Sequence, residues 1–338
     1  MFLSVIIIMF IVPMPRDPSK IVLKIILNRP TKKHPKSIDN NCGLVASSNP
    51  IHQNPWHVVL EYHYERRIAN RICGGSLIGK RHIITSAHCV EDVGFSIILV
   101  ALLGEYNMAS DRDCERGVCA DPVVRMVIAS IVIHPEYHNR MKNDLAIIIL
   151  EADAPYTDFI RPICLPTGNL SRHTTFYASG FGYTPRYKTY SDIKKDITLP
   201  YYPNCGRNYN GVTPDLICAG GIEGFDTCWG DSGGPLVRYG KRAELWGVTK
   251  GGNNDPCGLQ GQPGVYTSVD YHLSWIKKVI GETKGLNTTR KDLIKDEDML
   301  NNSATNNGST SLFVCFVFII NQWMNIFLKC TVIIMGMY

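Results

Sequence analysis

The segment Asp226-Thr-Cys-Trp-Gly-Asp-Ser-Gly-Gly-Pro235 carries more chemical information than any other stretch of the chain. A serine flanked by glycines, with an acid just before it, presents its hydroxyl as a nucleophile beside exposed backbone N–H groups. Such donors can hold the oxyanion that forms when a hydroxyl attacks a carbonyl. The same segment could also be an ordinary glycine-rich turn. Partners elsewhere in the chain must therefore decide between the two interpretations.

Two other segments supply the groups that a serine nucleophile needs. They are Thr85-Ser-Ala-His-Cys89 and Asn143-Asp-Leu-Ala146, and each adjoins a run of isoleucines. Because a serine hydroxyl is a poor nucleophile at neutral pH, Ser232 needs His88 to accept its proton. His88 in turn needs Asp144 to fix its tautomer and to stabilise the imidazolium. The order His88, Asp144, Ser232 is that of chymotrypsin-like enzymes, not of subtilisins or α/β-hydrolases.

Further short motifs lie around these segments in the order found in one enzyme family. With them, the chain from roughly Trp56 to Ile280 resembles the trypsin-like serine endopeptidases. The resemblance implies that Ser232 attacks the peptide carbonyl, that His88 carries the proton and that Asp144 orients His88. It also implies an oxyanion hole formed by the N–H groups of Gly230 and Ser232. The supporting motifs are Pro55-Trp56, Cys73-Gly-Gly-Ser-Leu-Ile78, Arg161-Pro-Ile-Cys-Leu-Pro166, Gly180-Phe-Gly182 and Pro263-Gly-Val-Tyr266.

Local patterns agree with the fold that the resemblance implies. Many short apolar segments, such as Trp56–Tyr62 and Ala146–Leu150, are separated by Gly, Pro and Asn, as in all-β proteins. A helix is predicted after Asp270, with its apolar residues on one face and Gly281 at its end. The family fold is all-β, with two six-stranded antiparallel β-barrels (chymotrypsin-like) and a C-terminal helix.

Composition bounds the class of protein. The chain has 338 residues, of which 45% are apolar and 19% charged, as in a folded globular protein. This length accommodates one domain of about 230 residues with extensions at both ends. The net charge of +5 is mild, and the basic residues are scattered rather than gathered into a stripe with aromatic residues. Nucleic-acid binding is therefore not expected.

Twelve cysteines indicate an oxidising compartment, and hence a secreted, extracellular protein. Sequence alone does not determine how they pair. The cysteine spacings do not fit a zinc site. Cys42 is the only cysteine before the protease body, so no clip domain is expected. The resemblance implies the pairs Cys73–Cys89, Cys205–Cys218 and Cys228–Cys257, and a likeness to insect clip-domain proteases implies Cys42–Cys164 and Cys114–Cys119.

Three regions are predicted along the chain. Residues 1–41 form a signal or pro region, with an apolar stretch at Phe2–Val12 but no Ala-x-Ala cleavage site; a mispredicted chain start is the alternative. Residues 42–281 form the peptidase domain. Residues 282–338 form a polar linker and an apolar tail, Leu312–Tyr338, which could be a membrane helix, a lipid-anchor signal or translation past a true exon end. Glycosylation sequons begin at Asn169, Asn287, Asn301 and Asn307.

Specificity is predicted to depend on Asp226, six positions before Ser232, where the family places the base of its primary pocket. A carboxylate there selects a long cationic side chain, because a buried charge is costly unless it is matched. Gly252 and Gly264 match wall positions that must stay small, and Trp229 would lie at the rim. The predicted cut is therefore after Arg or Lys.

The activation motif of the family is absent. Family zymogens are cut after a basic residue, and the new Ile-Val-Gly-Gly terminus pairs with the acid that matches Asp231. The matching stretch here is Cys42-Gly-Leu-Val-Ala-Ser47, without a basic residue before Leu44, and Lys20-Ile-Val22 lies too far upstream. Either an exon piece is missing, or activation differs, or Asp231 stays unpaired and the enzyme is weak.

The strand that binds the substrate backbone also departs from the family. The usual Ser-Trp-Gly is Lys250-Gly251-Gly252 here, unless this loop is shifted by one residue. The Lys250 ammonium would pair with Asp144 and weaken its hold on His88, or it would swing away. Loss of the Trp removes an apolar platform for the residues before the cut.

No cofactor is required by this chemistry, and calcium is the one structural ion that the sequence suggests. Glu105 and Asn107 match positions that ligate calcium in some relatives, and their oxygen atoms suit that ion. The alternative is that both are ordinary solvated side chains.

Three functions remain open at this stage. The first is an extracellular endopeptidase that performs limited proteolysis in a cascade. Its partners would be protein substrates, an upstream activating protease and protein inhibitors, and its apolar tail could tether it to a membrane. The second is a weak or inactive homologue that acts as a binding partner in such a cascade. A digestive protease is a third reading, which predicts no Cys42–Cys164 tether.

Overall fold

The computed structural model describes residues 41–64, 67–93, 97–140, 142–203, 205, 213–251, 257–283, 313–318 and 327–332. The chain divides into two compact units. One spans His34–Gly285, and the other combines Met1–Lys33 with Leu286–Tyr338. The signal region, the polar linker and the sequons at Asn287, Asn301 and Asn307 lie outside the described residues.

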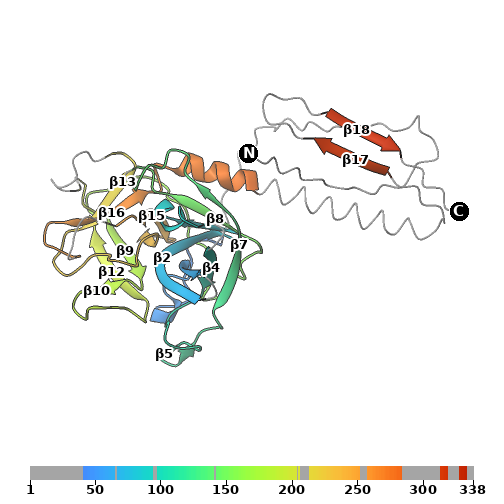
Figure 1. The fold of residues 1–338 in the computed structure, drawn as a ribbon. Helices are drawn as coiled ribbons and strands as arrows, with labels where there is room; N and C mark the ends of the chain where they lie inside the picture. The colour runs from blue at the N-terminus through green and yellow to red at the C-terminus, as the bar shows by residue number, and fades with distance from the viewer. Residues whose placement is uncertain are drawn as a thin grey trace. The chain divides into compact units, whose positions relative to one another are not determined.

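The first half of the larger unit is a closed six-stranded antiparallel barrel in the order β1-β2-β3-β8-β7-β4 (Figure 1). Two of its short strands, β3 and β8, are buried along their whole length, and β8 accordingly reads as a continuous apolar run. A small hairpin, β5 (Cys114–Glu115) with β6 (Val118–Cys119), projects from the loop between β4 and β7. The barrel strands are β1 (His57–Tyr64), β2 (Arg67–Gly79), β3 (His82–Thr85), β4 (Ile97–Leu103), β7 (Val124–Ile133) and β8 (Ala146–Leu150).

The second half is a six-stranded antiparallel sheet in the order β12-β9-β14-β15-β16-β13. Its two edge strands meet at one bridge, between Tyr201 and Ala219, so the sheet is nearly closed. Large aromatic side chains fill it, with Phe176, Trp246 and Tyr266 fully buried. The strands are β9 (Thr175–Gly180), β12 (Lys195–Pro200), β13 (Leu216–Gly220), β14 (Pro235–Arg238), β15 (Glu244–Thr249) and β16 (Pro263–Ser268). The predicted all-β class is confirmed, with one closed six-stranded barrel and a second six-stranded sheet that is nearly closed.

The predicted C-terminal helix is present at 273–283. Ile276, Val279 and Ile280 are buried against the first barrel's core. Gly281 does not end the helix as predicted, since the helix runs on to Thr283. The Thr283 hydroxyl lies 2.7 Å from His82 Nε2 of β3, and this contact ties the helix end to the barrel. Tertiary contact therefore outweighs the local preference of glycine.

In the apolar tail, the described residues form two strands. β17 (Phe313–Phe318) pairs antiparallel with β18 (Phe327–Val332), and Cys315 stands opposite Cys330 in the register. Among the described residues, no helix is both long enough and apolar enough to cross a membrane.

All the disulfide pairs that the resemblance implied are bonded: Cys42–Cys164, Cys73–Cys89, Cys114–Cys119, Cys205–Cys218 and Cys228–Cys257. Cys42–Cys164 fastens the segment before the barrel to the body. Beside it, Gly43 N–H donates to Pro162 O, and Gly43 O accepts from Ala243 N–H. The segment is thus held by a covalent bond and by two backbone hydrogen bonds.

We expect the disulfides to differ in what they contribute to stability. Cys42 and Cys164 are 122 residues apart in sequence, whereas Cys114 and Cys119 are 5 apart. Because a longer loop restricts the unfolded chain more, the chain-entropy model gives about 5 kcal/mol for the first pair and about 2 kcal/mol for the second. Urea unfolding of the Cys42→Ala/Cys164→Ala and Cys114→Ala/Cys119→Ala variants should rank them in that order. Equal losses would contradict the expectation.

Candidate active site

The pairing of β3 with β8 brings His88 and Asp144 together. His88 lies in the short 3-10 helix η3 (Ala87–Cys89) just after β3, Asp144 lies just before β8, and Thr85 pairs with Ala146. His88 Nδ1 is 2.7 Å from Asp144 Oδ2, and the His88 backbone N–H donates to Oδ1 at 3.0 Å. Asp144 is 1% exposed. A buried carboxylate with two such contacts fixes both the position and the tautomer of the imidazole.

Bonds from the second sheet support this pair. The Thr267 hydroxyl donates to Asp144 O at 2.9 Å, and the Ser86 hydroxyl donates to Thr249 O at 2.9 Å. The Cys73–Cys89 disulfide fastens the turn that carries His88 to β2. His88 and Asp144 are therefore held from both halves of the fold.

Ser232 lies in the turn before β14 and faces the first barrel across the seam. Its carbonyl accepts the Gly74 N–H at 2.6 Å, and Gly233 N–H donates to Thr249 O at 2.7 Å. Gly233 has a φ of +78°, and a Cβ there would collide with Thr85 Oγ1. Only glycine fits this turn. Among the described residues, Ser232 Oγ forms no hydrogen bond with His88 Nε2. The hydrogen bond between a nucleophile and its base is often long until substrate binds.

The two predicted oxyanion donors are available. Gly230 has a φ of +93°, in the region that glycine alone enters easily. In the described part of the chain, the N–H groups of Gly230 and Ser232 donate to no protein acceptor. Both donors can therefore serve a bound oxyanion.

Asp226 and Gly264 lie together as predicted for a pocket base and wall. A Cβ at Gly264 would collide with an Asp226 carboxylate oxygen. Burial raises the pKa of Asp226 to about 7, and a hydrogen bond from Thr227 N–H at 2.8 Å offsets part of that rise. Tyr266 was part of a quoted motif but was given no role in this site. Its buried ring lies beside Gly264, and its hydroxyl lies 3.2 Å from Thr227 Oγ1. Gly252 lies outside the described residues.

Trp229, the predicted rim residue, is 51% exposed. Its ring lies 5.4 Å from that of Tyr183, with an interplanar angle of 40°. An exposed aromatic face next to the pocket of Asp226 suits a guanidinium group.

Asp231 is held by backbone donors. Oδ1 accepts the Gly182 N–H and Oδ2 accepts the Cys228 N–H, both at 2.9 Å. Burial raises the pKa of Asp231 to about 6, against these two hydrogen bonds. Among the described residues no cationic side chain forms an ion pair with it. Asp231 and Asp226 both line a cavity of about 220 Å³.

Lys250 continues β15 beyond Thr249, and its N–H donates to Val265 O at 3.1 Å. Burial lowers the pKa of the Lys250 ammonium, while the nearby Asp144 and Asp215 act in the opposite direction. The negative charge of Asp144, the predicted catalytic acid, therefore acts on the Lys250 ammonium. Asp215, which sequence reasoning missed, also accepts the Asn143 N–H at 3.1 Å next to Asp144.

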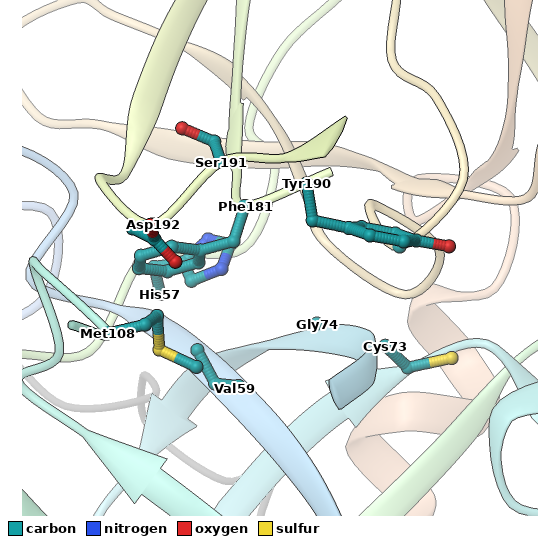
Figure 2. A pocket seen from close by; sticks show the side chains of 10 residues that line it. His57, Val59, Cys73, Gly74, Met108, Phe181, Tyr190, Ser191 and Asp192 are labelled. Atoms are coloured by element: carbon teal, nitrogen blue, oxygen red, sulfur yellow. The ribbon is translucent and has the colours of Figure 1, made fainter. Parts of the chain in front are cut away.

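A second pocket, of about 350 Å³, adjoins Gly230 (Figure 2). Figure 2 shows Tyr190, Phe181 and Asp192 on one side of it, and Met108 and Val59 on the other. At its floor, His57 is 5% exposed and its Nδ1 lies 3.1 Å from Ser179 Oγ. Burial, with a smaller effect of the Lys194 charge, lowers the pKa of His57 to about 3, so this histidine is neutral. Cys73, Gly74, Phe181 and Gly230 of its lining belong to the quoted motifs, but the sequence did not predict a second pocket.

The calcium prediction remains a prediction. Asn107 Oδ1 accepts the Ala109 N–H at 3.1 Å, and Glu105 is nearly buried. Asp113, which sequence reasoning did not single out, is the centre of this loop: it accepts N–H groups from Tyr106 and Asn107 at 3.1 and 2.9 Å. The grouping of Cys73, His88 and Cys89 is not a metal site, because both cysteines are disulfide-bonded. Asn169, the sequon within the body, is exposed.

Comparison with known proteins agrees with this geometry. Residues 45–276 match the family model for trypsin. The chain is 35% identical over 261 residues to CLIP domain-containing serine protease B8 of Anopheles gambiae, an alignment that covers 68% of this chain and 64% of that protein. It is 36% identical to Melanization protease 1 of Drosophila melanogaster, covering 66% of this chain and 62% of the relative. It is 33% identical to Phenoloxidase-activating enzyme 1 of Spodoptera litura, covering 72% and 70%. The chain thus spans just under two thirds of the length of the mosquito protein.

Removal of the Asp226 charge should stabilise the protein at high pH. The pKa of Asp226 is about 7 in the folded state, against about 3.9 in an unfolded chain. Between these values the folded state holds a proton that the unfolded state has lost, so stability falls as pH rises. Asp226→Asn should therefore match the wild type near pH 4 and exceed its melting temperature near pH 8. Asp121→Asn, at an exposed acid, is the control, and an equal shift at both pH values would argue against the assignment.

Proposed function

The chain belongs to the trypsin family of serine proteases, and on that premise we propose that it is an endopeptidase that cleaves after Arg or Lys. The observation that carries the proposal is the His88–Asp144 pair at 2.7 Å, beside a serine whose backbone is bonded across the same seam. Asp226 behind that serine supports the cationic specificity.

The proposed reaction forms and then hydrolyses an acyl-enzyme. Ser232 Oγ attacks the carbonyl carbon of the scissile bond while its proton passes to His88 Nε2. The oxyanion accepts the N–H groups of Gly230 and Ser232, and Asp144 stabilises the imidazolium. His88 then gives the proton to the leaving amine. A water molecule, activated by the same imidazole, releases the acid product and restores Ser232.

Specificity for Arg or Lys follows from the surroundings of Asp226. Its carboxylate is half-buried and its charge is disfavoured, as the raised pKa shows. A guanidinium or ammonium that enters the pocket relieves this cost, whereas an apolar side chain leaves it in place. The pocket therefore selects against uncharged side chains, because they leave the Asp226 charge without a partner.

We place this activity outside the cell, in limited proteolysis of protein substrates. The relatives named for melanization and phenoloxidase activation support a cascade with an upstream protease and protein inhibitors as partners. The disulfides support an oxidising compartment. Calcium, if it binds near Glu105, would be a structural ion and would take no part in the chemistry.

A non-catalytic homologue is the second candidate. Two observations favour it: Lys250 stands within electrostatic range of Asp144, and Asp231 has backbone donors in place of a cationic partner among the described residues. In this reading the same cleft binds a cascade protein without cutting it.

One experiment separates the two functions. The full chain, produced in a secretory host so that its disulfides form, is assayed with an Arg-containing peptide and with a matched peptide carrying Leu at the cut site. A proteolytic enzyme should cut only the first and should form an adduct at Ser232 with an organophosphorus reagent; Ser232→Ala should do neither. A chain with correct disulfides that gives neither turnover nor adduct would be the binding partner instead.

Binding of a cationic ligand should depend on pH in a defined direction. Because Asp226 has a pKa of about 7, benzamidine must displace its proton at lower pH. We expect the affinity to fall about tenfold for each pH unit below 7 and to level off above it. Calorimetry in buffers of different ionisation enthalpy should show proton release near pH 6. In Asp226→Asn, a pH dependence as steep as that of the wild type would assign the effect to another group.

A further inference from the structure

We propose that the hairpin of β10 (Tyr183–Thr184) and β11 (Thr189–Tyr190) is a positioning element for the oxyanion hole. It keeps the Gly230 N–H turned into the cleft while the chain is uncut between Cys42 and Leu44. This inference rests on the proposed proteolytic function and adds a residue to it: Tyr190 acts through Gly230 and does not itself touch the reacting atoms.

The first observation is the direction of one peptide group. The Tyr183 N–H donates to Trp229 O at 2.7 Å, so this carbonyl points toward the hairpin. In a trans peptide the C=O and the following N–H point in opposite directions. The Gly230 N–H therefore points away from the hairpin, and it has no protein acceptor in the described chain.

The second observation is that the ring of Tyr190, which is 54% exposed, lies directly beside Gly230. A Cβ at Gly230 would lie 3.0 Å from Tyr190 Cε1, 3.3 Å from Cδ1 and 3.4 Å from Gly182 Cα. The ring also packs edge-on against Tyr183, with centroids 5.7 Å apart. A glycine with a φ of +93° has little intrinsic preference for one peptide orientation. The ring and the Tyr183 N–H together supply that preference.

The alternative orientation shows what the hairpin prevents. If the Trp229–Gly230 peptide turned over, the Trp229 carbonyl would enter the cleft and leave the Tyr183 N–H unpaired. A carbonyl oxygen at that place would repel the developing oxyanion instead of stabilising it. The Tyr183–Trp229 bond therefore distinguishes a formed oxyanion hole from a collapsed one.

The base of the hairpin also holds Asp231. Gly182 N–H donates to Asp231 Oδ1 at 2.9 Å, and Gly182 O accepts the Ser191 N–H at 3.2 Å. Gly182 thus joins the two ends of the hairpin to the acid next to the nucleophile. In the uncut chain, this backbone donor and that of Cys228 hold the carboxylate in place.

The loop at 104–113 supports the hairpin from behind. Met108 N–H donates to Asp192 O at 2.8 Å, and Lys194 N–H donates to Tyr106 O at 2.9 Å. Asn107 forms a bridge with Ile193 between these two bonds. Asp113 braces the same loop through the N–H groups of Tyr106 and Asn107. The hairpin is therefore held in place by hydrogen bonds to the loop at 104–113.

The test compares three single variants of the full chain. Tyr190→Ala removes the ring and Tyr190→Phe keeps it. Tyr187→Ala removes a similarly exposed ring of the same hairpin that is not among the groups nearest Gly230. Loss of a whole oxyanion donor costs about 10²–10³ in kcat, so we expect Tyr190→Ala to lower kcat about tenfold or more. KM and benzamidine affinity should stay unchanged, because the pocket of Asp226 is intact. Tyr190→Phe and Tyr187→Ala should behave as the wild type.

A second readout does not require turnover. A peptide aldehyde with Arg at its end forms a hemiacetal with Ser232, whose oxygen occupies the oxyanion hole, whereas benzamidine does not reach it. Tyr190→Ala should bind the aldehyde more weakly and benzamidine equally. If this variant fails to bind benzamidine, and hence to fold, Tyr190→Leu is measured in its place.

The outcomes are distinguishable. Wild-type kcat and aldehyde affinity in Tyr190→Ala, with an active parent, would overturn the positioning role and leave the protease function standing. Equal losses in Tyr190→Phe or Tyr187→Ala would also overturn it. A parent chain that forms no adduct at Ser232 would instead reject the protease function, and this inference with it.

Discussion

The active site depends on how closely the two halves of the fold approach at Gly74 and Gly233. The bond from Gly74 N–H to Ser232 O is 2.6 Å long and crosses the seam, while the bond from Gly233 N–H to Thr249 O binds the same turn to β15. A side chain at Gly233 would push Thr85 away. Thr85 is three residues before His88 in the chain. The close backbone contact at Gly233 therefore sets the distance between Ser232 and His88.

Three buried or half-buried aspartates near that seam have three different surroundings, and hence three uses. Asp144 has an imidazole partner, Asp231 has two backbone donors, and Asp226 faces a pocket and accepts backbone N–H groups of Thr227 and Gly258. Burial disfavours the charge of Asp226 and Asp231, as their raised pKa values show. In the proposed function a ligand cation would satisfy Asp226, and the cost of burying its unmatched charge would make the site selective.

The sequence predicted the parts of this site that carry chemistry, because Ser232, His88 and Asp226 occur in short, specific motifs. It also predicted the all-β fold, and the family resemblance implied the disulfide pairs. It did not point to Tyr190 or His57, since the contacts of these residues with Gly230 and Ser179 join segments that lie 40 or more positions apart and share no local pattern. Gly281 was assigned to a helix end by its local preference, which packing of the neighbouring isoleucine and valine residues overrides. Short motifs thus encode reactivity, whereas the orientation of a single peptide group is a property of the folded chain.

The Cys42–Cys164 bond determines whether a cut in the segment before β1 would release a fragment. A cut anywhere between Cys42 and the start of β1 would create two chains, yet both would remain one covalent particle with one diffusion coefficient. Any molecule that is bound by the residues before Cys42 would then stay attached to the trypsin-like domain. Cleavage there could alter the protein's chain ends without altering where it resides.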